Sequence, residues 1–506
     1  MTDPSRFPDP VYQETVLEPL FEGVKAHHTG HLRAINRAHL VMLAETGIVP
    51  PGTAAALARA LAQIDAEIDV PSLRYTGAHE DYFFLVEAEL RHRLGPDIAG
   101  ALHTARSRND MDHTVFKLAL HDRTDALIGD ALALADALVA TARRERDTLI
   151  VAYTHGQPAQ PTTWGHYLGA VIEVLLRDLA RLDAARGGLD HCPMGAAAIT
   201  TSGFAIDRHR TAALLGFAGP QENAYGCIAA VDYVTALYSA MKLVFVHLGR
   251  VLQDMQFWTA FEVGQLYVPN AFVQISSIMP QKRNPVPIEH LRHLASMTAG
   301  RCDAMVNTMH NTPFTDMNDS EGEVQVAGYA AFDSAARVLA LLRALIPACR
   351  VRADRVAANM DAACATVTEL ADTLVRTEAL SFRQAHEIAA RTARAVIAEG
   401  APLGAGHAAF CAAFEAEVGR APTLDVTAFA RAVDPAQFVA LRTRFGGPAP
   451  EPMDAALAGY AATLDTLRAA RDARITRRAD ADRARDAAFS ALMTDDQRTE
   501  DKIWPQ

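Results

Sequence analysis

One helical seam constrains the fold of this chain more than any other feature. Apolar side chains recur at steps of three and four residues without a break, at Val234, Leu237, Met241, Val244, Leu248, Val251 and Met255. This spacing places them on one face of a helix. A membrane span requires roughly 20 mainly apolar residues. One histidine and three charged residues interrupt this segment: His247, Lys242, Arg250 and Asp254. The seam therefore predicts a helix buried against other helices, not a membrane span.

Similar patterns occur on both sides of this segment. Apolar residues repeat at Leu127, Ala131, Leu134 and Leu138. The stretch from about residue 360 to 400 reads as two more helices joined near Ser381. We find no alternation of strands with helices and no internal repeat. The sequence predicts an all-α protein.

Changes in composition predict three domains. We expect an N-terminal helical domain over residues 1–105, a central helical bundle over 106–357 and a C-terminal helical domain over 358–506. Near the end of the chain, "RAARDARITRRADADRARDAA" alternates Arg and Asp at helical spacings. This pattern is typical of a solvated helix with ion pairs four residues apart.

Charge and cysteine usage exclude several classes of protein. The chain has 506 residues, with 60 acidic against 48 basic side chains, a net charge of -12 and no basic block, so we expect no nucleic-acid partner. The N-terminal "MTDPSRFPDP" resembles no export or organelle signal, which favours the cytoplasm. Six cysteines are scattered without a C-x-x-C pair, which argues against zinc sites and a disulfide framework.

Three polar stretches interrupt the helical pattern, and the first is "HTARSRND", His103 to Asp110. Asn109 and Asp110 stand where helix caps are expected, just ahead of a long helix. The stretch is consistent with a capped helix start that carries exposed arginines. It is also consistent with an anion site in which Ser107, Arg108, Asn109 and backbone amides bind a carboxylate.

The second stretch is "AYTHGQPAQP", Ala152 to Pro161. Its two prolines prevent an uninterrupted helix, so we expect Thr154, His155 and Gln157 in a loop or a first helical turn. Taken alone, a histidine beside a threonine is usually a hydrogen-bonded loop residue.

The third stretch is "ISSIMPQKRNP", Ile275 to Pro285. A serine is a poor base unless a positive charge and dry surroundings activate it, and Lys282 is a plausible source of that charge for Ser276. Prolines limit the loop's conformations while polar residues keep it at the surface, a combination that suits a lid over a substrate. A solvated connector would leave this pattern unexplained.

Together these stretches resemble a known family. "SSIMPQKRNP" resembles the signature loop of the fumarase/aspartase superfamily, Gly-Ser-Ser-x-x-Met-Pro-x-Lys-x-Asn in loose form. "HTARSRND" resembles "HTGRSRND" of argininosuccinate lyases, "YTHGQPAQP" their "YTHLQRAQP", and "LADTLVRTEALSFRQAH" their "LADYLVRKGVPFREAH". The similarity runs in order from about residue 34 to 400.

The resemblance implies a three-domain, all-α protomer and a homotetramer whose core contains about twenty helices. Each active site would gather the three stretches from three chains. The reaction implied is an elimination that breaks a carbon–nitrogen bond and gives fumarate and an amine. No metal, nucleotide or flavin is required, and H-E-x-x-H, P-loop and G-x-G-x-x-G motifs do not occur in the sequence.

The resemblance also implies roles for individual residues. Within the signature loop, residues 275–287, Ser276 matches the base. Lys282 and Asn284 match the groups that stabilise the carbanion. His155 matches the catalytic histidine, and Glu289 matches the acidic residue paired with it. The implied substrate ligands are Ser107, Arg108, Asn109, Thr154, Gln157, Ser277 and Met279.

Departures from the argininosuccinate lyase pattern concern the amine half of the substrate. Ile275 replaces a glycine, Val286 replaces an aspartate, and "AAVD" from residue 229 replaces a Ser-Asp-Arg-Asp run. The tyrosine, glutamine and lysine that hold the arginine moiety in the family fall on Asp316, Glu321 and Val324. The N-terminal piece that should cover the site reads "VKAHHTGHLR".

We therefore predict retained succinyl chemistry with a changed amine. Asp316 and Glu321 would accept hydrogen bonds from an ammonium group. Lys25, His27 and His28 would receive additional carboxylates. The substrate would be an N-substituted aspartate or an aminopolycarboxylate, as in ethylenediamine-disuccinate lyases or iminodisuccinate-processing relatives. Alternatively, these side chains belong to ordinary solvent-facing surface.

Two other functions stay open. The first is a true argininosuccinate lyase with changed recognition residues. The second is a non-catalytic structural relative, like the lens proteins of this family. The intact Ser276, Lys282 and His155 argue against the second.

Overall fold

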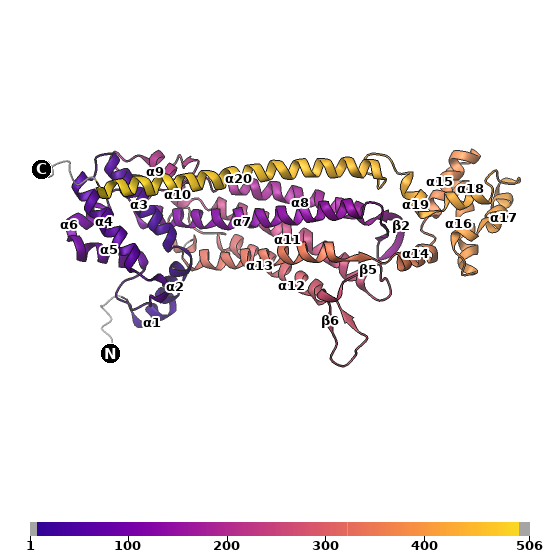
Figure 1. The fold of residues 1–506 in the computed structure, drawn as a ribbon, viewed down its shortest axis with the longest axis horizontal. Helices are drawn as coiled ribbons and strands as arrows, with labels where there is room; N and C mark the ends of the chain where they lie inside the picture. Colours follow the sequence, from indigo (N-terminus) through magenta and orange to yellow (C-terminus); the bar gives the residue numbers. More distant parts are fainter. Residues whose placement is uncertain (1–7, 321, 495–506) are drawn as a thin grey trace.

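The computed structural model describes residues 8–320 and 322–494, and its helices confirm the all-α class. Figure 1 shows an elongated molecule in which long helices connect an N-terminal unit at one end with a C-terminal cluster at the other. A hairpin labelled β6 projects from the side of the long helices (Figure 1). This projection carries the signature loop.

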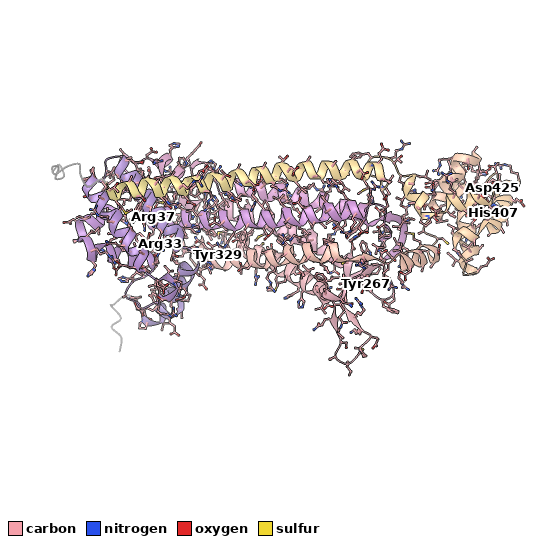
Figure 2. All side chains as sticks on the ribbon, in the orientation of Figure 1. Arg33, Arg37, Tyr267, Tyr329, His407 and Asp425 are labelled. Atoms are coloured by element: carbon pink, nitrogen blue, oxygen red, sulfur yellow. The ribbon has the colours of Figure 1, made fainter. Side chains whose placement is uncertain are left out.

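Short helices build the N-terminal unit around an apolar core of its own. Its elements are α1 (Pro10–Tyr12), the π-helix η1 (Gln13–Leu17), α2 (Glu18–His27), α3 (Thr29–Glu45), α4 (Pro51–Glu67), the 3₁₀ helix η2 (Val70–Ser72), α5 (Tyr82–Leu94) and α6 (Pro96–Ala101). Arg33 and Arg37 of α3, labelled in Figure 2, form ion pairs of 3.1 and 2.8 Å with Asp65 of α4. These ion pairs hold α3 and α4 against each other.

The central bundle contains the longest helices of the chain. They are α7 (Arg108–Arg144), α8 (Trp164–Gly187), α11 (Asp232–Thr259), α12 (Val286–Thr308), α13 (Glu323–Ala348) and α20 (Pro450–Thr494). On α11, every seam residue except the partly buried Val251 is at most 4% exposed, which confirms the predicted seam. Within the described residues, α11 alone has the length and apolar composition of a membrane span. Its seam is packed inside the bundle.

Helix α20 returns along α7 and α8 to the N-terminal unit (Figure 1). Its arginines reach aspartates outside the helix: Arg468 pairs with Asp136, Arg474 with Asp183 and Arg477 with Asp190, at 2.7–2.8 Å. The expected solvated helix with internal ion pairs is therefore correct only for the outer face. By its contacts α20 belongs with the bundle, whereas the domain boundaries near residues 105 and 357 stay a prediction.

Short elements connect the long helices. They are β3 (His191–Cys192), α9 (Arg208–Leu214), β4 (Gly219–Pro220), α10 (Ala224–Ala229), β5 (Leu266–Tyr267), η3 (Asn270–Phe272), β6 (Gln274–Ile275), β7 (Arg283–Asn284), η4 (Asn318–Ser320) and β8 (Arg350–Val351). The described strands form four two-stranded pairs: β1 (Leu149–Thr154) with β2 (Gln157–Thr163), β3 with β4, β5 with β8 and β6 with β7.

The C-terminal cluster has a third apolar core. It contains α14 (Ala353–Ala362), α15 (Val367–Glu378), α16 (Phe382–Ala398), η5 (Leu403–Ala405), α17 (His407–Val418), α18 (Val426–Ala432) and α19 (Pro435–Ala440). Ser381 caps α16 and separates it from α15, as the sequence predicted. Figure 2 shows His407 and Asp425 within this cluster, at the far end from Arg33.

The stretch after α7 differs from the prediction. We expected a loop or a first helical turn, but the chain forms an antiparallel hairpin of β1 (Leu149–Thr154) and β2 (Gln157–Thr163). His155 and Gly156 join the strands with φ angles of 54° and 73°. Positive φ at both central residues is the requirement of a tight hairpin turn. The two prolines are tolerated because a strand of an isolated pair has an open edge.

Candidate active site

The first motif forms the start of α7. Ser107 is the N-cap, and its backbone N–H donates to Oδ1 of Asp110 at 2.9 Å, which completes a capping box. Oδ2 of the fully buried Asp110 accepts the N–H groups of Gly195 and Ala197, both at 2.9 Å. Nδ2 of Asn109 donates to the carbonyl of Ala198 at 3.0 Å. The helix start is capped as predicted, but the cap is Ser107 and not Asn109 or Asp110. The expected exposure is wrong for Arg106, which is buried and donates to Oδ1 of Asn36 at 2.7 Å. The motif also holds the loop after β3 in place.

We expect Asp110→Ala to lower the free energy of unfolding by about 2–5 kcal/mol, because it removes a cap and leaves buried N–H groups without an acceptor. Denaturant unfolding at fixed protein concentration would measure this loss. The matched control is Asp207→Ala on α9. Asp207 caps a helix by accepting only the N–H of Arg210, at 2.9 Å, so its loss should cost about 1 kcal/mol. Equal losses in the two variants would contradict the role given to Asp110.

Carboxylates surround Arg108 at the same end of the bundle. Nη1 of Arg108 lies 3.0 Å from Oε1 of Glu80, and Nη2 lies 3.0 Å from Oδ2 of Asp81. Burial raises the pKa of Asp112 to about 7, and the nearby Asp81 and Asp316 act in the same direction, against the opposing charge of Arg108. Oδ1 of Asp316 is buried, and no hydrogen-bond partner for it occurs among residues 8–320 and 322–494. This end of the site therefore carries more negative than positive groups.

The predicted residues of α2 lie at this end and make internal contacts. His28 is buried, with Nε2 2.8 Å from the hydroxyl of Tyr329, which Figure 2 labels where the N-terminal unit meets the bundle. Burial lowers its pKa to about 3, so the ring is neutral at pH 7. The alternative of a surface histidine is therefore wrong for His28.

The neighbours of His28 are also engaged. Burial and the adjacent Arg123 lower the pKa of His27, whose Nδ1 lies 3.2 Å from Nη2 of that arginine. Lys25 forms an ion pair with Glu22 and donates to the carbonyl of Leu73 at 3.2 Å. A role of these side chains in receiving carboxylates stays a prediction. The predicted Glu321 lies outside the described residues.

The second motif lies at the tip of the β1–β2 hairpin. Thr154 pairs with Gln157 across the turn, and His155 is exposed between them. A left-handed backbone at a residue other than glycine costs free energy and is most common at functional sites. Because His155 is exposed at the tip of the hairpin, its imidazole is accessible from outside the protomer.

The third motif is a hairpin with a firm base and an exposed tip. Ile275 pairs with Arg283, so Ser276 and Lys282 are the next residues on the two sides. Nη2 of Arg283 donates to the carbonyl of Val268 at 2.7 Å, and its guanidinium lies over the ring of Tyr267, which Figure 2 places where this hairpin leaves the bundle. Oγ of Ser276 accepts the N–H of Met279 at 3.0 Å.

Other predicted residues of this motif are also accessible. Ser277, Met279, Lys282 and Glu289 are exposed, and Asn284 is half-buried in β7. Ile278 is 83% exposed and Ile275, on the same hairpin, is 75% exposed. The tip is thus available to a surface outside its own chain.

The structure does not bring the three motifs together within one protomer. Ser107 and the β1–β2 hairpin lie at opposite ends of α7, a helix of 37 residues, which spans about 55 Å at ~1.5 Å per residue. Asp316, Lys25, His27 and His28 share the end that carries Ser107. Glu80, Asp81 and Asp112, which surround Arg108, were not among the residues predicted from the sequence. The Asp ahead of an aromatic-rich helix start was the signal for Asp81.

The chain is similar to known lyases. A family model described as Lyase matches residues 28–300, and one described as Argininosuccinate lyase C-terminal matches residues 364–440. The chain is 61% identical over 469 residues to Argininosuccinate lyase 2 of Agrobacterium fabrum, which covers 92% of this chain and 93% of the relative. It is 34% identical to an Argininosuccinate lyase of Methanothermobacter thermautotrophicus, over 82% of this chain and 88% of the relative.

A solved structure has the same fold. The crystal structure of EDDS lyase in complex with formate superposes with a TM-score of 0.83 at 27% identity and covers 97% of both chains. The chain belongs to the lyase family of the fumarase/aspartase superfamily, in its argininosuccinate lyase-like branch. It is a carbon–nitrogen lyase.

Proposed function

We propose that the protein reversibly eliminates an amine from an N-substituted aspartate to give fumarate. The observation that carries this proposal is the signature hairpin, in which Ser276 and Lys282 directly follow and precede the last strand pair, Ile275 with Arg283, and Arg283 holds the base of the hairpin to Val268. Ser276 removes the proton next to a carboxylate of the succinyl group. Lys282 and Asn284 stabilise the carbanion that forms, because preorganised charge and donors are worth several kcal/mol there, about 3 for one donor.

The remaining residues bind the substrate or assist the departure of the amine. His155, paired with Glu289, assists the cleavage of the carbon–nitrogen bond. The substrate carboxylates are bound by the start of α7, by Thr154 and Gln157 of the β-hairpin, and by Ser277 and Met279 of the signature hairpin. Since one protomer separates these groups by about the length of α7, we propose a homotetramer with sites shared between chains. The enzyme works in the cytoplasm and needs no cofactor.

We assign the amine half of the substrate to the acidic end of the site. Asp316 has a buried oxygen that is unpartnered within the described part of the chain and lies close to Asp112, and both carboxylates suit a cationic nitrogen. An N-succinyl diamine or an aminopolycarboxylate offers such a nitrogen. The name of EDDS lyase, whose structure has the same fold, supports a substrate of that class.

Argininosuccinate, also an N-substituted aspartate, is the second candidate. The relative named Argininosuccinate lyase 2 favours it, since it is 61% identical over nearly the whole chain. Against it, the positions that hold the arginine moiety in the family carry other residues here. Loss of two or three charged hydrogen bonds costs about 3–9 kcal/mol if additive, which is at least ~100-fold in affinity.

Side-by-side kinetics separate the two candidates. We expect fumarate to be released more slowly from argininosuccinate than from an N-succinyl diamine. The absorbance of fumarate measures both rates. Turnover of argininosuccinate with kcat/KM of about 10⁴ M⁻¹s⁻¹ or more, the range of efficient enzymes, would instead establish the second candidate.

We expect Asp316→Asn to raise the KM of the amine by about 10-fold in the addition direction, because one charged hydrogen bond is worth about 1.5–3 kcal/mol. The KM of fumarate should not change, since Asp316 lies on the amine side. The matched control is Asp319→Asn, an exposed carboxylate three residues further along. A change in the KM of fumarate alone would indicate that Asp316 lies on the succinyl side of the substrate.

A further inference from the structure

Two carboxylates of the segment that leads into α5 hold the side chain of Arg108. Glu80 and Asp81 each lie 3.0 Å from a different terminal nitrogen of the guanidinium. The guanidinium also lies over the ring of Phe84, 5.3 Å from its centroid. Contacts on two edges and one face leave a long side chain little freedom to rotate.

The guanidinium keeps donors for a further ligand. It has five N–H groups, and two ion pairs do not saturate them. The Arg108 side chain is 39% exposed, and it also lines a cavity with Asp81, Asp112 and His28. A donor that is already oriented loses less conformational entropy when a ligand binds.

We propose that Glu80 and Asp81 are positioning residues, which hold the Arg108 guanidinium in the orientation that binds a substrate carboxylate. The inference rests on the proposed function, in which Arg108 is a ligand of the dicarboxylate. Asp81 has a second task, because its Oδ1 accepts the N–H of Phe84 at 3.0 Å and so caps α5. A test must therefore remove the ion pair and keep the cap.

The double variant Glu80→Gln with Asp81→Asn meets this requirement, since Asn caps a helix about as well as Asp. We expect the KM of fumarate to rise about 5- to 10-fold, with kcat changed less than about 2-fold, because the two variants weaken charged hydrogen bonds to Arg108 alone. Arginine or ethylenediamine serves as the amine, whichever the unmodified protein uses. In an Arg108→Ala background the two substitutions should have no further effect, as residues that act through one partner are not additive.

A similar arrangement on α5 provides the control. Arg93 of α5 also lies between two carboxylates, 2.7 Å from Glu67 and 3.2 Å from Glu89. Glu67→Gln with Glu89→Gln should leave the KM of fumarate unchanged. A merely structural role of Glu80 and Asp81 would lower the melting temperature or the active fraction without a change in KM.

The outcomes separate this inference from the proposed function. If Arg108→Ala raises the KM of fumarate but the double variant leaves that KM unchanged or lowers it, the positioning inference is overturned and Arg108 stays a ligand. If Arg108→Ala leaves the KM unchanged, Arg108 is no ligand, and both this inference and that part of the proposed site fail.

Discussion

Ser276→Ala should reduce fumarate release at least ~100-fold, because a positioned base contributes about 10²- to 10⁴-fold. The effect should be on kcat, since Ser276 acts on the reacting carbon rather than on the bulk of the substrate. The fold should be unaffected. Oγ of Ser276 makes its hydrogen bonds within an exposed hairpin, to the N–H groups of Met279 and Ile278, and such bonds are worth about 1 kcal/mol. Steady-state kinetics and circular dichroism measure the two expectations.

Two further variants sharpen this test. Lys282→Met should cause a loss of similar size, because it removes the positive charge next to the serine and the carbanion. Ser72→Ala is the matched control, an exposed serine with one local bond to the carbonyl of Asp69 at 2.9 Å, and it should keep full activity. If Ser276→Ala keeps more than a small fraction of the rate, the base lies elsewhere.

Hybrids of two inactive variants should recover activity if sites are shared between chains. In a random mixture of Ser276→Ala and His155→Ala protomers, each site draws an intact residue from each of two chains in about one quarter of cases. The expected rate is about a quarter of that of the unmodified protein and roughly 25-fold above either parent, if each parent has lost ~100-fold.

Co-expression of two differently tagged variants yields the hybrids, and sequential affinity steps isolate them. The control mixes two tagged copies of the same variant, Ser276→Ala, which should recover nothing. Within one protomer α7 separates Ser107 from His155 by about 55 Å, so a site that contains both needs two chains. The family resemblance implies that Ser276 comes from a further chain. Inactive hybrids of demonstrated composition would show that Ser276 and His155 of one site belong to one chain.

The helical parts of the fold could be predicted because local patterns determine them. The seam of α11 and the capped starts of α7 and α16 depend on side chains within a few turns, and all are confirmed. The β1–β2 hairpin was mispredicted as a loop or a helical turn. Its prolines indicated a break from helix, but its pairing depends on the backbone angles of His155 and Gly156.

Contacts between distant segments could not be predicted from the sequence patterns. The arginines of α20 have aspartates nearby in sequence, so internal ion pairs were the natural expectation, whereas packing against α7 and α8 adds ion pairs with aspartates of those helices. Internal pairs also form, since Arg468 lies 2.7 Å from Asp465 of its own helix and 2.8 Å from Asp136 of α7. The site likewise depends on contacts between distant segments. Arg108 could be identified from its motif, but Glu80 and Asp81 lie 28 and 27 residues before it in the chain, and only the fold brings them to its guanidinium.

The most direct test of proton transfer and carbon–nitrogen bond formation is the addition of an amine to fumarate in D₂O. Fumarate with arginine or ethylenediamine should give an N-substituted aspartate that carries one deuterium, in a single configuration, on the carbon next to the one that bears nitrogen. Proton NMR and mass spectrometry identify the product, and Ser276→Ala should form almost none. Deuterium in both configurations, or no adduct from either amine together with no fumarate from argininosuccinate, would contradict the account.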